Sequence, residues 1–493
     1  MNFLLIFILI PMLMMVGLFF ANNRKQINLI TLSGSVLLLL SAIGLTFLYL
    51  HQRAIGNTAE MLFITDVPWY PAFNIHFLVG VDGISVIMLL LSSIIVFASV
   101  LVSWKIDTMP KEYFIWFSLL SAGAFGFFIS LDLFTLFFFL EMSLVPKFLL
   151  IGIWGSGKKE YSAFKLALMV MGGSVLVLFG ILGIYYFSGA ESMNLLELAK
   201  HTIPLNIQYY LFVSSFVGFG IIGAMFPFHS WVPDGHSSAP TSVSMFLSGI
   251  SMKLGAYGAF RVAIFLLPEA AHQLAWIFLI LAAFSVFYGA FTALAQTDLK
   301  YINAYASISH CGLLFFAFLI FNETAITGAF LQMISHGLIT ALFFATIGMI
   351  YSRTHTRMIN DMNGLMKVIP FIGVSFTIAG LASLGLPGFS GFIAEMTIFV
   401  GAFQETDLLH RVLTLIAATS IVITAVYILR VVGKVLFGTI TNKHHLEFAD
   451  ATWWERVSVI VLVIAIAGLG SAPMLFSNMI NDSLQPVLNN LMR

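Results

Sequence analysis

Long apolar runs with very few charges constrain the fold of this chain more than any other feature. Charged residues make up 9% of the 493 residues and hydrophobic residues 60%, whereas about a quarter of an ordinary soluble domain is charged. A helix of about 20 apolar residues crosses the hydrocarbon core of a bilayer, and it satisfies every backbone N–H and C=O without water. The sequence therefore predicts an all-α polytopic membrane protein surrounded by lipids.

With about 20 apolar residues for each span, we expect about 14 transmembrane helices. They centre on residues 3–20, 28–50, 82–104, 112–130, 132–154, 161–187, 208–228, 240–266, 273–297, 301–321, 325–350, 370–402, 409–437 and 455–476. The first run has no positive residue before it and no small-residue cleavage site, so we interpret it as a span rather than a signal peptide. Lysine and arginine gather in alternate connections, which predicts that these connections are cytoplasmic and that both termini lie on the opposite face.

The composition argues against several classes of function. The formal net charge is zero, which gives no case for a nucleic-acid partner. Cys311 is the only cysteine, so the chain cannot form an internal disulfide or hold a cysteine-ligated cluster or zinc ion. The sequence has neither a phosphate-binding loop nor a GxSxG motif. We expect no cofactor and no metal in this chain, so any redox chemistry belongs to other chains.

Two of the expected spans are interrupted by proline and small residues. One interruption is MFPFHSW around Pro227, in the stretch from Phe219 to Lys253, and the other is SLGLPGFSGF around Pro387. Irregular backbone is tolerated at membrane depth only inside protein or beside water. The two stretches form a weak internal repeat, and the five spans from one to the next predict that the second copy is inverted. Inverted repeats with broken helices point to an ion site near the midplane.

Ionisable residues lie deep inside otherwise apolar runs. They are Glu141, Lys165, Lys253 and Glu395. A charge at the bilayer centre costs roughly 2.5 to 3.5 kcal/mol on insertion scales, and a changing neighbour can switch such a group between its protonated and deprotonated forms. These are groups that proton transfer needs. Two alternatives stay open: Lys165 is near enough to the cytoplasmic end to snorkel, and the other three can be paired charges that fix helix packing.

Two histidines lie between the buried lysine and the last buried glutamate. His310 and His336 are in adjacent expected spans, and imidazole exchanges protons near neutral pH. We interpret them as steps of a proton relay, and the alternative is that they are hydrogen-bonding core residues. The polar residues around Pro227 are instead interpreted as helix-end caps and loop structure: His229, Asp234 and His236.

Several long motifs resemble one family. They are FFLEMSLVPKFLLIGIWG, PFHSWVPDGHSSAPTSVS, SGISMKLGAYG, AQTDLKYINAYASISHCG, QMISHGL and LPGFSGFIAE. From about Gly80 to Phe437 the chain resembles the antiporter-like membrane subunits of respiratory complex I, NADH:quinone oxidoreductase, which are related to Mrp-type cation/proton antiporters. The resemblance implies a subunit of a proton-translocating enzyme, a translocase, in the bacterial cytoplasmic (inner) membrane, with both termini on the periplasmic side.

The resemblance also implies an architecture and a set of partners. Two inverted five-helix repeats, helices 4–8 and 9–13, would have helices 7 and 12 broken. The single membrane domain would divide into peripheral helices, a first repeat, a second repeat, and a C-terminal helix and tail: 1–104, 112–266, 273–437 and 438–493. The expected partners are other membrane-arm subunits, especially two neighbouring antiporter-like subunits. NADH, FMN, iron–sulfur clusters and quinone would be bound by other subunits.

The protonatable residues of the family fall on buried residues of this chain. By motif they correspond to residues of the fifth, sixth, eighth, tenth, eleventh and twelfth helices, in this order: Glu141, Lys165, Lys253, His310, His336 and Glu395. The resemblance implies that protons move along a hydrated row of such residues and that this movement is coupled to quinone reduction elsewhere in the complex.

The sequence departs from the family in the first half of the broken seventh helix. A lysine is usual there, whereas this chain has Ile222. Lys147, six residues after Glu141, stands where the family has an apolar or aromatic side chain. Six residues correspond to about 9 Å along a helix and about 120° around it, and a long side chain leans back toward the N-terminus. We therefore hypothesise that Lys147 replaces the missing lysine, and the alternative is a contact with a headgroup or with backbone carbonyls.

Two other functions stay open. A subunit of an Mrp-type cation/proton antiporter shares the helix core and would transport Na+ without a redox arm. A structural spacer of the membrane arm that no longer pumps is favoured by Ile222. Against the spacer, a disused path would not be expected to keep Glu141, Lys253 and Glu395 at a cost of several kcal/mol.

Overall fold

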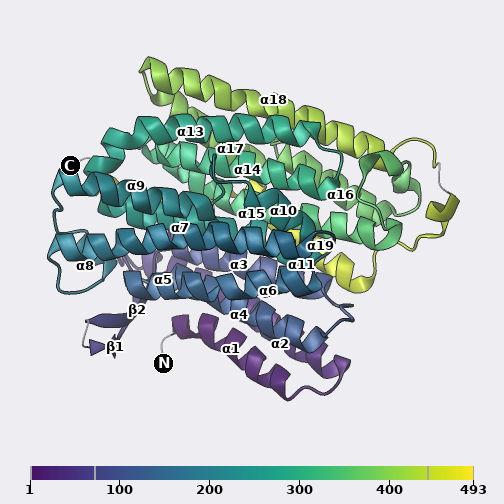
Figure 1. Cartoon of the computed structure of the whole chain (residues 1–493), viewed down its shortest axis with the longest axis horizontal. Coiled ribbons are helices and arrows are strands. Elements are labelled where there is room, and N and C mark those ends of the chain that lie inside the picture. Colours follow the sequence, from purple (N-terminus) through teal and green to yellow (C-terminus); the bar gives the residue numbers. More distant parts are fainter. Residues whose placement is uncertain (1–2, 72–73, 441–442, 492–493) are drawn as a thin grey trace.

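The structure is a computed structural model that describes residues 3–71, 74–440 and 443–491. Most of these residues lie in helices that run side by side, horizontally in Figure 1. The helices are α1 (Ile6–Phe19), α2 (Arg24–Ala54), α3 (Gly83–Val102), α4 (Pro110–Ile129), α5 (Leu133–Met142), α6 (Leu144–Trp154), α7 (Lys159–Ser188), α8 (Leu195–Leu198), α9 (Leu205–Ile222), α10 (Trp231–Ser238), α11 (Thr241–Phe246), α12 (Met252–Gly258), α13 (Pro268–Ala295), α14 (Leu299–Phe318), α15 (Glu323–Thr354), α16 (Pro370–Ser383), α17 (Ser390–Gln404), α18 (Leu408–Leu436), α19 (Trp453–Ser471) and α20 (Pro473–Leu491). Two π-helical segments, Leu247–Ser251 and Ala259–Ile264, flank α12.

Within the described residues, 11 helical stretches are long and apolar enough to cross a membrane. One of them joins α5 and α6 into Leu133–Trp154. The remaining expected spans fall on shorter or divided helices. Residues 3–20 hold the short α1, residues 240–266 alternate between α-helical and π-helical segments, and residues 370–402 are divided between α16 and α17. The structure supports the predicted helical membrane protein, whereas the count of about 14 spans stays a prediction.

The spans expected to be interrupted are interrupted in the structure. α9 ends at Ile222 and α10 begins at Trp231, and α16 ends at Ser383 before α17 begins at Ser390. The indole N–H of Trp231 donates to the carbonyl of Ile221 at 2.9 Å, so one carbonyl at the end of α9 is satisfied inside the protein. The inverted relation between the two halves of the chain stays a prediction.

A glycine lets α12 pack directly on the end of α9. A Cβ on Gly255 would lie 2.3 Å from the backbone nitrogen of Gly223 and 2.6 Å from the carbonyl oxygen of Phe219. Only a residue without a side chain allows two backbones to approach so closely. Gly255 therefore holds the helix that carries Lys253 against the interrupted span.

A β-hairpin corrects the prediction of an all-α chain. It lies in the connection between α2 and α3, where β1 (Leu62–Tyr70) pairs antiparallel with β2 (Ile75–Val81). In its register Thr65 faces Val79. The apolar length of a helical span does not predict this hairpin, because its strands of 9 and 7 residues are too short to form one.

The C-terminal segment also differs from the expected tail. Residues after α19 form α20, a helix with one buried face made by Met479, Ile480, Leu484, Val487 and Leu488. The hydroxyl of Ser483 accepts a hydrogen bond from the backbone N–H of Gly83 at 2.8 Å, so α20 packs on the start of α3. Polar residues make α20 less hydrophobic than a membrane-spanning helix. Only the recurrence of apolar residues every three to four positions indicates that it is an amphipathic helix.

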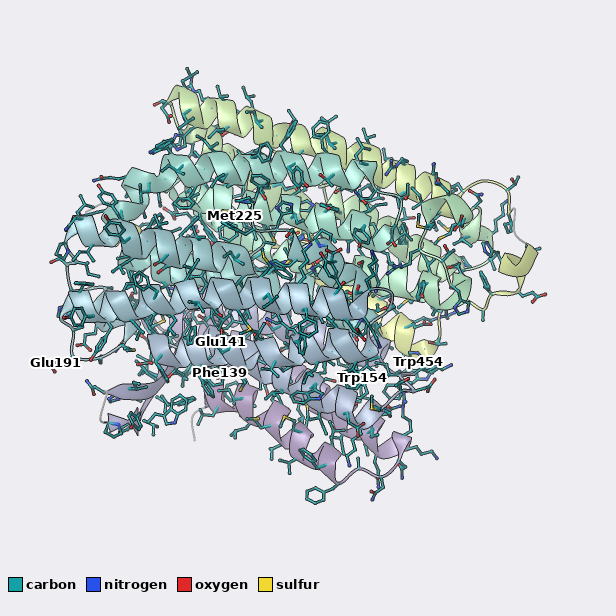
Figure 2. All side chains as sticks on the ribbon, in the orientation of Figure 1. Phe139, Glu141, Trp154, Glu191, Met225 and Trp454 are labelled. Carbon is teal, nitrogen blue, oxygen red and sulfur yellow. The ribbon has the colours of Figure 1, made fainter. Side chains whose placement is uncertain are left out.

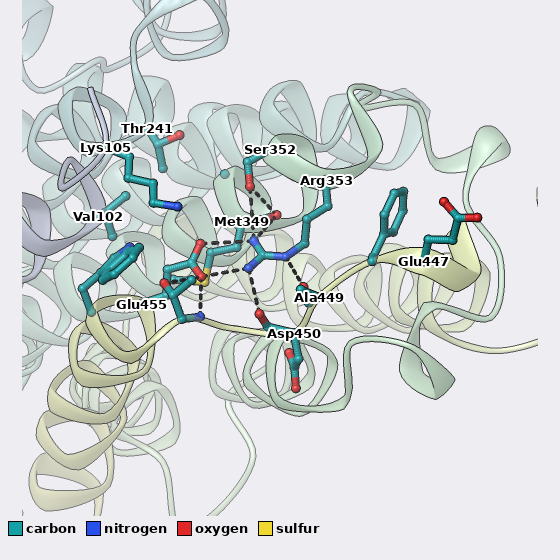
Figure 3. A pocket seen from close by; sticks show the side chains of 14 residues that line it. Val102, Lys105, Thr241, Met349, Ser352, Arg353, Glu447, Ala449, Asp450 and Glu455 are labelled. Carbon is teal, nitrogen blue, oxygen red and sulfur yellow. Dashed lines mark hydrogen bonds and ion pairs between the residues drawn. The ribbon is translucent and has the colours of Figure 1, made fainter. Parts of the chain in front are cut away.

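Arg353 at the end of α15 holds three helices together (Figure 3). Its guanidinium contacts Glu455 of α19 at 2.8 Å and donates to the carbonyls of Ala449 and Asp450 at 2.7 and 3.1 Å. The Asp450 carboxylate accepts from the backbone N–H of Phe371, in the first turn of α16, at 2.8 Å. These contacts line a pocket of about 610 Å³ and fix α15 relative to α16 and α19.

Candidate functional site

A row of ionisable side chains from α12, α15, α14 and α17 meets inside the protein. The Nζ of Lys253 lies 2.6 Å from the Nδ1 of His336. The ring of His336 is 5.2 Å from the ring of His310, measured between centroids. The Nδ1 of His310 lies 3.3 Å from the Oε1 of Glu395. The fold thus places a lysine and a glutamate from distant spans at the two ends of a pair of imidazoles.

The row is shielded from solvent. Lys253 is 0% exposed, His336 2% and Glu395 7%. Lys253 also donates to the carbonyl of Ser248 at 2.6 Å, and Ser248 belongs to the π-helical segment before α12. Single π-helical turns inside α-helices occur frequently at functional sites. Ionisable groups at this depth are retained when they pair with one another or with backbone carbonyls, and the row contains both kinds of pair.

The loop that divides α16 from α17 approaches Glu395 closely. A Cβ on Gly385 would lie 3.0 Å from the Oε2 of Glu395, and Gly385 has a φ of +73°, which glycine adopts without strain. The side-chain nitrogen of Gln332 lies 3.1 Å from the Nδ1 of His310. A cavity of about 10 Å³ is bordered by Gln332, Ser383 and the His310, His336 and Glu395 side chains. Its volume is about that of a single water site.

Lys165 is placed in a second polar cluster and not in the row. Its Nζ lies 2.7 Å from the Oδ2 of Asp234, and the hydroxyl of Tyr301 donates to the other oxygen of Asp234 at 3.1 Å. Asp234 and Tyr301 border a pocket of about 700 Å³, which Lys158 and Arg357 also line. The side chain of Lys165 is 25% exposed and pairs with Asp234, whose carboxylate is on the border of this pocket. Asp234, which we interpreted as a loop residue, is its partner.

Glu141 lies apart from the row, on an outward face of α5. Phe138 and Val145, about one turn before and after it, are 40% and 55% exposed. Figure 2 shows Glu141 below α7, next to Phe139. Among the described residues, the carboxylate of Glu141 has no ion-pair or hydrogen-bond partner, although its backbone carbonyl accepts from the N–H of Ser143. A carboxylate at this depth is costly without a partner.

Lys147 is buried on the other side of the same span. It is 3% exposed, so a lipid headgroup contact does not fit this position. Its Nζ donates to the hydroxyl of Ser143 at 3.0 Å, and the charge of Glu141 acts on it, although no ion pair joins the two in the described part of the chain. The replacement of the missing seventh-helix lysine by Lys147 stays a prediction.

Our reading of the sequence missed two buried cations. Arg261, eight residues after Lys253 in the same expected span, pairs with Asp82 at the start of α3, and both are nearly inaccessible. Its spacing from Lys253 within one apolar run was a signal that could have identified it. Lys300, which the charge pattern placed in a connection, is 4% exposed and donates to the carbonyl of Ala239 at 2.7 Å. This carbonyl lies at the end of α10, where a cation is favourable.

The described residues contain no group of three His, Cys, Asp or Glu side chains that could hold a metal ion. The chemistry that the row supports is proton transfer. An amine, two imidazoles and a carboxylate follow one another along the row, each close to the next, and all of them can bind and release protons.

The fold and the buried row define the class of protein as an antiporter-like membrane subunit. Residues 130–424 match the family described as NADH:quinone oxidoreductase/Mrp antiporter, transmembrane. The chain belongs to this family, which confirms the resemblance drawn from the motifs.

The relatives agree with this membership over most of the chain. NADH-quinone oxidoreductase subunit M of Rickettsia prowazekii is 35% identical over 478 residues, which cover 96% of this chain and 95% of the relative. An NAD(P)H-quinone oxidoreductase chain 4 of Microcystis aeruginosa is 34% identical over 454 residues, covering 85% and 81%.

Solved structures share the whole fold. A chain of respiratory complex I from Thermus thermophilus with bound NADH superimposes with a TM-score of 0.88 at 25% identity, covering 99% of both chains. A chain of the Mrp complex from Dietzia superimposes with a TM-score of 0.85 at 17% identity, covering 99% and 98%. The second likeness is one of fold alone.

Proposed function

We propose that this chain is a proton-translocating membrane-arm subunit of an NADH:quinone oxidoreductase. The observation that carries the proposal is the row from Lys253 through His336 and His310 to Glu395, in a chain that belongs to the quinone oxidoreductase and Mrp antiporter family. The 35% identity to a protein named subunit M supports the quinone oxidoreductase branch. NADH, FMN, iron–sulfur clusters and quinone would be bound by other subunits.

In this proposal protons move along the row and leave beyond Glu395. The polar pocket around Asp234 and Lys165 would take up protons on one face, and Lys253 would receive them. His336 and His310 would pass them on to Glu395, with a water in the cavity beside them bridging the step between the two rings. Water-bridged hydrogen bonds are nearly as favourable as direct ones, so one ordered water is enough to connect the two rings.

Glu141 indicates where a neighbouring subunit lies. Because its face of α5 is exposed and the described chain offers it no partner, we infer that an adjacent antiporter-like subunit covers this face and contributes a group that pairs with Glu141. A change of charge in that neighbour would then act on Glu141. Lys147, which feels the charge of Glu141, would carry the effect into the chain.

The wider architecture belongs to the same proposal. Two inverted five-helix repeats would occupy 112–266 and 273–437, between the peripheral helices of 1–104 and the C-terminal part of 438–493. The protein would lie in a bacterial inner membrane with both termini on the periplasmic side, where the positive-inside rule places them.

An Mrp-type antiporter subunit is the second candidate. The fold likeness to the Dietzia complex supports it, but at 17% identity this likeness carries only the fold. The two candidates differ in whether proton movement requires quinone reduction.

The experiment uses membrane vesicles that contain the intact complex. Proton uptake and quinone reduction are measured together for Glu141→Gln and Lys253→Ala. We expect both variants to assemble and both rates to fall. Lys253→Ala removes a protonatable group from the row, and Glu141→Gln removes the charge on which the neighbouring subunit would act. A wild-type ratio of protons to electrons and wild-type rates in both variants would refute the proposal. Proton movement that continues without NADH but depends on Na+ would favour the antiporter.

A further inference from the structure

His236, in the last turn of α10, is a fully buried imidazole whose ring nitrogens have no hydrogen-bond partner among the described residues. It is 0% exposed, and both Nδ1 and Nε2 are unpaired. An unpaired buried polar group destabilises the folded protein, so each such group needs an explanation. Our reading of the sequence assigned His236 to helix capping, but in the structure its side chain caps nothing.

Hydrogen bonds connect the end of α10 with the segment that holds Lys253. The backbone carbonyl of His236 accepts from the hydroxyl of Ser244 at 2.9 Å. Ser244 lies about one turn before Ser248, whose carbonyl accepts from Lys253 at 2.6 Å. The aromatic ring of Phe344 stacks on the ring of His236 at 5.2 Å with an interplanar angle of 12°. The imidazole is therefore held in a fixed plane against α15, the helix that also carries His336.

α10 connects this imidazole to the polar pocket. Asp234, Ser237 and Ser238 border the pocket of about 700 Å³, and all lie within two residues of His236. α10 thus presents polar side chains to the pocket and, in its last turn, carries His236, which is buried away from solvent.

We propose that His236 passes protons between the pocket around Asp234 and the Lys253–His336 pair. This inference rests on the proposed function, to which it adds the uptake step. A proton from water in the pocket binds the unprotonated ring nitrogen of the neutral imidazole, and the imidazolium releases the proton of its other nitrogen to the amine of Lys253. One N–H bond forms and one breaks, so the ring returns to neutrality as its other tautomer. Such a relay needs both ring nitrogens free of permanent partners, which is the arrangement observed.

Two variants separate proton transfer from packing. His236→Phe keeps an aromatic ring that can stack on Phe344 but cannot carry a proton, and His236→Gln keeps a polar side chain that can hydrogen-bond but does not titrate. The matched control is His229→Phe, since His229 lies beside the same interruption, packed between the rings of Phe226 and Tyr288, and is not part of the row. Lys253→Ala serves as the reference for a blocked row.

Proton uptake and quinone reduction are measured in vesicles that contain the intact complex, after its assembly has been confirmed on native gels. We expect proton uptake in both His236 variants to fall at least about tenfold, to the level of Lys253→Ala, while His229→Phe pumps like wild type. If His236→Phe does not assemble, His236→Gln decides. Wild-type pumping in the His236 variants with loss in Lys253→Ala would overturn this inference and leave the proposed function intact. Wild-type pumping in all of them would overturn both.

Discussion

The Nζ of Lys253 and the Nδ1 of His336 lie 2.6 Å apart. At this distance the two nitrogens can share one proton, but they cannot each hold a proton directed at the other. A proton that arrives on the Nδ1 of His336 therefore requires Lys253 to lose a proton or to move away. The pair thus has two arrangements with different interaction energies, which is what coupling between a proton path and a distant event requires.

The first prediction separates a lysine that exchanges its proton from a lysine that only supplies charge. Lys253→Arg keeps a positive charge, but arginine is not deprotonated in proteins. We expect proton uptake to fall at least about tenfold, since a positioned proton-transfer group typically contributes about 100-fold or more, although the complex assembles. The measurement is proton uptake in vesicles during NADH oxidation, with Lys253→Ala alongside. Pumping above about half of the wild-type rate would show that Lys253 acts as a fixed charge.

The residues of the row could be predicted because each is an ionisable residue among apolar neighbours in the sequence. Lys253, Glu395 and the two histidines stand inside runs that are otherwise apolar, and a charge there has a cost that needs a reason. The order in which they meet could not be predicted. It depends on how α12, α14, α15 and α17 pack, and a helix that is apolar on all sides gives no indication of which face meets which neighbour.

Other parts of the site were missed for the same reason. The sequence predicts Asp234 as a loop residue, and only the packing of α7 shows that it pairs with Lys165. The sequence likewise predicts His236 as a helix cap, whereas the structure shows that its ring is buried. The hairpin and α20 were missed because they do not cross the membrane. A search for spans detects apolar length, whereas these elements are marked by alternation and by amphipathic periodicity.

The second prediction concerns the close approach of α12 and α9. A Cβ on Gly255 would lie within 2.7 Å of backbone atoms of Gly223, and backbone atoms cannot move aside as a flexible side chain can. We expect Gly255→Ala to cost about 1–3 kcal/mol, as overpacking does, and to lower the thermal unfolding midpoint of the solubilised complex. Gly433→Ala is the control, because a Cβ there has nothing within 4 Å. Equal midpoints for the two variants would contradict the close packing.

The third prediction tests whether Lys147 replaces the missing lysine at Ile222. Lys147→Met removes the charge and keeps an unbranched side chain, so the buried site stays filled. We expect proton uptake to fall at least about tenfold, because α5 and α6 then have no ionisable residue besides Glu141 to carry its effect into the chain. In the double variant Lys147→Met with Ile222→Lys, the lysine returns at the end of α9, and we expect proton uptake to recover. A double-mutant cycle, which compares wild type, Lys147→Met, Ile222→Lys and the double variant, measures the coupling between the two positions.

Wild-type pumping in Lys147→Met would show that the residue only packs against Ser143. A double variant that assembles but stays as slow as Lys147→Met would show that the two lysines do not serve the same place in the path.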